Sequence, residues 1–130
     1  MTDYRQWFGL SSVTLGVGNI LQPVVSSLSS VTDNNARHKV YSAFTWKNLT
    51  VVITANTWDE AADIVCRDTT VSTAITVNIP TGTTGNFEDT SNTHSLAADD
   101  YINILCQQNV ITSGTATLYG GTTLSSASAV

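Results

Sequence analysis

The residues of this chain that could take part in catalysis are few and scattered. His94 is followed by Ser95 and, five residues later, by Asp99, which are the residue types of a Ser-His-Asp triad. No Gly-x-Ser-x-Gly turn accompanies them, and adjacent residues on a strand point to opposite faces, so the hydroxyl and the imidazole cannot easily meet. We therefore interpret His94 as a loop histidine and predict no catalytic residues.

Carboxylates gather in two turn-rich parts of the sequence. They are Asp59, Glu60 and Asp63 in the first part, and Glu88, Asp89, Asp99 and Asp100 in the second. Calcium needs six or more oxygen ligands, which Asp and Asn side chains in sandwich turns can supply. Two carboxylates at the right separation would instead serve a glycosidase. Neither site has a motif behind it, so we predict solvated turn carboxylates, with calcium as the alternative, and no cofactor.

The two cysteines, Cys66 and Cys106, both stand in apolar, strand-like surroundings. We expect two buried free thiols that pack as small hydrophobic side chains. A disulfide is the alternative, and it requires neighbouring strands with close Cα atoms. Neither cysteine has a partner at metal-ligand spacing, so the sequence predicts no metal site.

Aromatic residues are the best candidates for contact with a partner. Trp58 stands in a polar loop, and Trp7, with Tyr4 close by, precedes the first clear strand. Trp46 lies beside Phe44 within a predicted strand and is expected in the core. We predict Tyr4, Trp7 and Trp58 as contact residues, either at a protein interface or on a platform on which sugars stack.

The composition excludes several classes of partner. Only 12% of the 130 residues are charged, and the net charge is −5 with five Lys and Arg, too few for a nucleic-acid-binding surface. No stretch is long and apolar enough to span a membrane, and the first residues do not resemble a signal peptide, so we expect synthesis in a cytoplasm. Because a free monomer normally carries more surface charge, the low charge indicates contact with copies of the chain or with another protein.

Short apolar alternations separated by Thr, Asn, Gly and Asp dominate the chain, as in Leu49, Val51 and Ile53, which alternate with polar residues. Period-two alternation is typical of half-buried strands, and several at regular spacing predict an all-β antiparallel β-sandwich of about eight strands. The strands expected are 39–46, 48–55, 62–67, 71–79, 84–88, 92–97, 100–107 and 115–120. Residues 1–38 are predicted as an extended N-terminal arm that could supply the first strand or two, residues 39–120 as the sandwich, and residues 121–130 as a small polar tail.

Two stretches of the chain resemble a group of jelly-roll proteins from tailed phages and prophages. The first is the strand ending in Ala55-Asn56-Thr57, and the second is the turn that begins at Val77-Asn78-Ile79-Pro80 and runs to Thr90. Cys66-Arg67 and the Ala-Asp-Asp segment before Tyr101 fill two further places of the pattern. The chain departs from it at Asp99, where the group has glycine, and at Asp68-Thr69-Thr70, where it has an Asn-Gly hairpin.

The resemblance, which covers residues 44 to 107, implies a jelly-roll protein of the virion, often trimeric, located on the capsid or in a tail or fibre. We therefore expect a non-enzymatic capsid decoration protein that forms a homotrimer and binds the major capsid protein or another virion protein. The alternative is a receptor- or glycan-binding module of a tail or fibre, for which an exposed Trp58 would be needed. A small hydrolase on the same fold is the third and least supported interpretation. The resemblance brings no catalytic residues with it.

Overall fold

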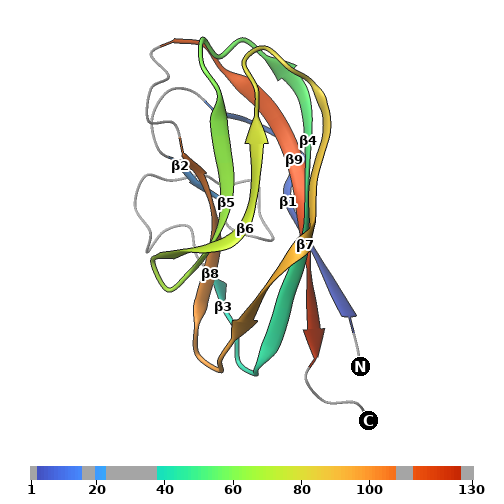
Figure 1. The fold of residues 1–130 in the computed structure, drawn as a ribbon, viewed down its shortest axis with the longest axis vertical. Coiled ribbons are helices and arrows are strands. Elements are labelled where there is room, and N and C mark those ends of the chain that lie inside the picture. The colour runs from blue at the N-terminus through green and yellow to red at the C-terminus, as the bar shows by residue number, and fades with distance from the viewer. Residues whose placement is uncertain (1–2, 16–19, 23–37, 108–112, 127–130) are drawn as a thin grey trace.

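The computed structural model describes residues 3–15, 20–22, 38–107 and 113–126. Within them the chain forms nine strands and no helix, arranged as two facing antiparallel sheets (Figure 1). The strands are β1 (Asp3–Leu15), β2 (Ile20–Gln22), β3 (His38–Lys39), β4 (Phe44–Asn56), β5 (Ala62–Asp68), β6 (Val71–Ile79), β7 (Gly85–Leu96), β8 (Tyr101–Gln107) and β9 (Ala116–Ser126). The predicted antiparallel β-sandwich is therefore confirmed.

Strand pairing follows a nested pattern. Sheet A has the order β1-β9-β4-β7, and sheet B has the order β2-β8-β5-β6, with β3 also paired to β8. The first strand thus pairs with the last, β2 and β3 pair with β8, β4 pairs with β7, and β5 pairs with β6. Two further pairings, β4 with β9 and β5 with β8, join these pairs into sheets. The described strands are therefore nested like one long hairpin, and its successive strand pairs lie alternately in sheet A and sheet B.

The core lies between the sheets and consists of the apolar residues that alternate along the strands. Trp46, Leu49, Val51 and Ile53 of β4 are each at most 2% exposed. The facing sheet supplies Ile64, Cys66, Ile75, Val77, Ile79, Ile102, Ile104 and Cys106. Burial of side chains of this size contributes about 1.5–3 kcal/mol each, so the alternation drives the fold.

A β-bulge in the middle of sheet A changes two predicted boundaries. Lys47 and Leu49 pair with Thr93 and Asp89, so one residue of β4 faces three residues of β7. Asn48 takes the extra turn with a φ of 58°, which Asn tolerates better than most residues. The predicted strands 39–46 and 48–55 are instead β3 and the continuous β4, and the predicted strands 84–88 and 92–97 are the single strand β7.

Both ends of the chain differ from the prediction. Residues 3–15 and 20–22 form strands of the two sheets, in agreement with the expectation that the N-terminal segment could supply the first strand or two. Residues 23–37 lie outside the described part. The predicted tail beginning at residue 121 is wrong up to residue 126, because this segment belongs to β9, which lies between β1 and β4. Thr122, Thr123, Leu124 and Ser125 are all less than 5% exposed. The last strand is thus an interior strand of sheet A.

Candidate functional site

The three tryptophans do not behave alike. Trp46 is fully buried, as predicted, and Trp58 is only 2% exposed, which corrects its predicted role as an exposed contact residue. Tyr4 and Trp7 lie in β1, where only the backbone pairing with Leu124 and Gly121 is described. The side chains of Tyr4 and Trp7 lie outside the described part of the structure, so their role as contact residues stays a prediction.

Trp58 is turned inward by the polar residues around it. The amide of Trp58 donates to Asn56 Oδ1 at 3.0 Å, while Asn56 Nδ2 donates to the Thr83 carbonyl at 3.1 Å. The amide of Thr57 donates to the Thr115 carbonyl at 2.7 Å. These bonds satisfy the backbone on both sides of Trp58, so the indole packs into the core at the end of the sandwich.

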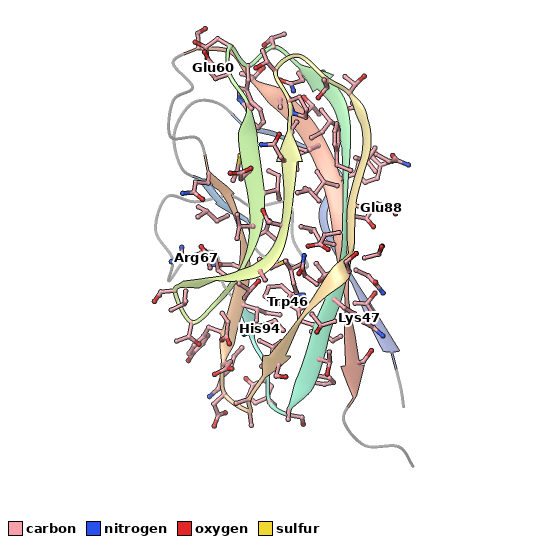
Figure 2. All side chains as sticks on the ribbon, in the orientation of Figure 1. Trp46, Lys47, Glu60, Arg67, Glu88 and His94 are labelled. Atoms are coloured by element: carbon pink, nitrogen blue, oxygen red, sulfur yellow. The ribbon has the colours of Figure 1, made fainter. Side chains whose placement is uncertain are left out.

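His94 forms a polar contact between the two sheets. Its Nε2 lies 2.7 Å from Oδ2 of Asp68, which belongs to β5 of sheet B, whereas His94 belongs to β7 of sheet A. His94 is therefore a strand residue, which corrects the predicted loop. Ser95 is exposed, and the carboxylate that His94 meets is Asp68, not Asp99. Figure 2 shows His94 beside Trp46 on the inner side of sheet A. This contact links the sheets.

Asp89 forms a second polar link between the sheets. It is 7% exposed, and its carboxylate accepts the amides of Ser91 and Asn92 at 3.1 and 3.0 Å and the side-chain amide of Asn92 at 2.9 Å. Its Oδ2 also accepts the amide of Thr76, on β6 of the facing sheet, at 3.1 Å. The predicted solvated carboxylate is wrong here, because Asp89 both organises the bulge of β7 and satisfies an edge amide of β6.

Hydrogen bonding determines the charge state of Asp89. Burial acts to raise the pKa of Asp89, but the hydrogen bonds from Asn92, Thr76 and Ser91 outweigh it and leave that pKa below its usual value. The buried carboxylate is thus held as an anion. Burial, together with the nearby charge of Asp89, raises the pKa of the Cys66 thiol well above its usual value. Cys66 is therefore a packed, unreactive thiol.

Both cysteines are free and buried, as predicted. In the β5–β8 ladder Cys66 faces Ile104, and Cys106 faces Ile64, so the two cysteines are diagonal neighbours on one face. Diagonal Cα atoms lie roughly 7–8 Å apart in such ladders, beyond the usual reach of a disulfide. The alternative of a disulfide is therefore not supported.

Three further carboxylates accept hydrogen bonds in loops or between strands. Asp59 Oδ1 accepts the Ser113 amide at 3.2 Å, and Asp100 Oδ2 accepts the Ala97 amide at 2.9 Å. Asp63 accepts the side-chain amide of a residue on the neighbouring strand at 2.9 Å. No group of three or more His, Cys, Asp or Glu able to hold a metal occurs among the residues that the structure describes.

Two turns at one end of the sandwich place side chains where glycine is usual. Thr69 and Thr70, between β5 and β6, have φ of 44° and 70°, and Asp99 has φ of 75°. These are the positions where the resembled phage proteins have Asn-Gly and glycine. A β-branched residue in this region is a genuine outlier. Hydrogen bonds hold the hairpin, because the Thr69 amide donates to Tyr101 O and Arg67 donates to the Thr70 carbonyl.

Tyr41 is the exposed aromatic of this end, and the sequence did not single it out. It is 76% exposed and follows β3, and the Lys39 ammonium lies 5.4 Å from its ring centroid. Lys39 also forms an ion pair with Asp99 at 3.3 Å, and this hydrogen bond and charge raise the pKa of Lys39. The signal available in the sequence is Lys39 two residues before Tyr41, since such residues share one face of an extended chain and can form a cation–π contact.

The residues of β4 and β9 that point away from sheet B are mostly small and uncharged. Since Trp46, Leu49, Val51 and Ile53 point inward, the intervening residues of β4 and their partners on β9 point outward. They are Thr45, Lys47, Thr50, Val52 and Thr54 on β4, and Thr117, Tyr119, Gly121, Thr123 and Ser125 on β9. Gly121, Thr123 and Ser125 are buried, so the accessible part of this face is formed by the β4 residues with Thr117 and Tyr119. Figure 2 shows Lys47, with Glu88 of β7, on this side of the molecule, away from sheet B.

Comparison with family models, with curated proteins and with solved structures finds no match. Among the described residues no helix has the length and hydrophobicity needed to cross a membrane. The geometry of the described residues offers two surfaces: the low-charge outer face of β4 and β9, and the exposed Tyr41.

Proposed function

We propose that this protein is a non-enzymatic structural protein of a phage particle. In this proposal it is a capsid decoration protein, made in the host cytoplasm, that forms a homotrimer and stabilises the shell by binding the major capsid protein or another virion protein. The side chains with catalytic potential, His94, Asp68 and Asp89, hold the two sheets together, which supports a structural role.

The strand order supports a jelly roll, the fold that the sequence resemblance implies. In a jelly roll two Greek keys interleave, and the nested pairing of β1 with β9, β2 and β3 with β8, β4 with β7, and β5 with β6 fits that arrangement. Jelly rolls are frequent in viral capsid proteins and in lectin domains. Because a fold hosts many functions, the surface has to decide between these classes.

The observation that carries the proposal is the scarcity of charge on the two interior strands of sheet A. Lys47 is the one charged residue among the 13 residues of β4 and the 11 residues of β9. Removing neutral hydroxyls from water costs far less than removing charges, and the centres of protein interfaces are depleted of charge. The accessible part of this face, formed by the outward residues of β4 with Thr117 and Tyr119, can therefore be buried against a shell at low desolvation cost. Its charged groups are Lys47 and, on the neighbouring β7, Glu88.

Co-sedimentation with capsids that lack the protein tests the proposal. Thr45 is half-buried on the outer face, and its neighbours in register, Ser95 and Ser125, are neutral, so Thr45→Asp adds one charge without a like-charged neighbour. We expect this variant to bind capsids about tenfold more weakly or worse, a loss of roughly 1.4 kcal/mol, and to lose its protection against heat. Ser72→Asp, on exposed β6, is the matched control and should bind normally. Absence of binding by the unmodified protein would refute the decoration role.

Tyr41 favours a second candidate, a receptor- or glycan-binding module of a tail or fibre. With Trp58 buried, Tyr41 is the strongly exposed aromatic among the side chains that the structure describes, and a sugar could stack on it beside the Lys39–Asp99 ion pair. In that case Tyr41→Ala should abolish retention on a polysaccharide column, whereas Val71→Ala, at the other strongly exposed apolar residue, should not. Retention that is unchanged in Tyr41→Ala would count against this candidate.

A further inference from the structure

Residues 3–15 and 20–22 complete both sheets from one side of the sandwich. β1 lies at the end of sheet A on β9, and β2 lies at the end of sheet B on β8, while β6 and β7 form the opposite side. We call β1 and β2 together the edge unit. Within the described residues the backbone ladders of the edge unit run only to β9 and β8, one neighbour for each strand.

The rest of the sandwich requires an edge unit. β1 pairs with β9 from Asp3↔Ser125 to Leu15↔Ala116, and β2 pairs with β8 from Ile20↔Cys106 to Gln22↔Ile104. Without these pairs two interior strands become open edges, and buried residues at Thr122, Thr123 and Ser125 lose a neighbour. Open edges of this kind readily accept a strand from another chain. The sandwich therefore needs an edge unit on β9 and β8, and this unit can come from the same chain or from another copy of it.

The chain between the edge unit and the body is much longer than the gap it spans. Gln22 pairs with Ile104, and His38 pairs with Ile102, so both residues lie on the same edge of β8 and only Asn103 separates their partners. Residues 23–37, fifteen in all, connect them. Fifteen residues can extend to about 50 Å, which is far enough to reach a neighbouring molecule of this size.

We infer that the edge unit is exchanged between copies of this chain, so that β1 and β2 of one subunit complete the two sheets of its neighbour in the homo-oligomer. The exchanged and unexchanged forms contain the same strand pairs, so exchange costs only the entropy of association. Neighbours held side by side on a particle have a high effective concentration, which offsets that cost. The inference deepens the proposed function and rests on its homo-oligomer.

The opposite side of the sandwich cannot exchange in this way. β5 and β6 are joined by a turn in which Thr69 and Thr70 are the only residues between the strands. The carboxylate of Asp89, on β7, also bonds the edge amide of Thr76, on β6. This side therefore provides an internal control for the experiment.

Engineered disulfides test the exchange. Thr14 and Thr117 are direct partners in the β1–β9 ladder, and direct partners have Cα atoms about 4.5–5.5 Å apart, within the range of a disulfide. Thr14→Cys with Thr117→Cys is oxidised in the full chain, both concentrated in solution and bound to capsids, and then run on a non-reducing denaturing gel. Asp63→Cys with Asn78→Cys, partners in the β5–β6 hairpin, is the matched control and should give monomers only.

Exchange predicts covalent dimers or trimers from the Thr14/Thr117 pair under at least one of the two conditions. Monomeric products alone under both conditions would overturn the inference, because the disulfide would then have formed within each chain. That result would leave the proposed function standing if the unmodified protein still co-sediments with capsids. Covalent multimers without capsid binding would keep the exchange and refute the decoration role.

Discussion

Replacing Thr70 by glycine should stabilise the protein, although it removes a side chain. Thr70 has φ of 70° in a two-residue hairpin turn, a conformation that costs a non-glycine residue about 1–2 kcal/mol. Glycine gains that amount but loses about 0.5–1 kcal/mol through its greater freedom in the unfolded chain. The Thr70 carbonyl, which accepts a hydrogen bond from Arg67, is retained in the glycine variant. At the midpoints of these two ranges the net gain is about 0.75 kcal/mol.

That gain can be measured by thermal and urea unfolding followed by circular dichroism. For a chain of 130 residues the entropy of unfolding is roughly 0.27 kcal/mol/K, so Thr70→Gly should raise the Tm by about 2–4 °C. Ser72→Gly, two residues further along and without a positive φ, should instead lower the stability by about 0.5–1 kcal/mol. Equal destabilisation by both glycines would refute the reasoning, because it would mean that the turn stores no backbone strain.

Three further outcomes are expected. Because the folded pKa of Asp89 lies below its usual value, the stability that its charge contributes is present above about pH 4 and is lost as the pH falls through the folded pKa. Urea midpoints measured between pH 2 and pH 7 should show this loss. Asp89→Asn should make the midpoints less dependent on pH and should lower the stability at neutral pH by about 2–3 kcal/mol. Alanine substitutions of His94 and Asp68, singly and together, should give a coupling energy of about 0.5–1 kcal/mol, because both side chains are partly exposed. Strictly additive effects on stability would mean that this contact does not stabilise the packing of the two sheets. Gly114→Ala should cost about 3 kcal/mol or more, because its Cβ would overlap neighbouring backbone, whereas Gly82→Ala, with open space around it, should cost only about 1 kcal/mol from its positive φ; thermal melts distinguish the two.

Apolar alternation predicts where strands run, but it does not distinguish a bulge from the end of a strand. Around Asn48 in β4 and after Asp89 in β7 the alternation changes phase, and the prediction divided each strand there. In the folded sheet the same phase change is a bulge, stabilised by hydrogen bonds to the Asp89 carboxylate. One of the donors to that carboxylate, Thr76, lies on the facing sheet, so no local pattern could have revealed the burial of Asp89.

Small residues concealed the second half of β9, an interior strand of sheet A. The segment Gly120-Gly121-Thr122-Thr123 lacks the large apolar residues by which strands are recognised, yet it lies between two other strands and is buried by them. Trp58 shows the converse error, since its polar neighbours suggested exposure. Those neighbours bond to each other and to backbone groups, which lets the indole pack inside.

The pairing of the first strand with the last determines when this protein can fold. Asp3 is the partner of Ser125, and β9 separates β1 from β4, so sheet A has a gap until almost the whole chain has been synthesised. Contacts between residues so distant in sequence close slowly. While the ribosome still holds the C-terminal residues, the unpaired edges of β1 and β4 are open to neighbouring nascent chains on the same message. In the homo-oligomer proposed above, copies of the chain can therefore begin to pair on the polysome, before any single copy has finished folding.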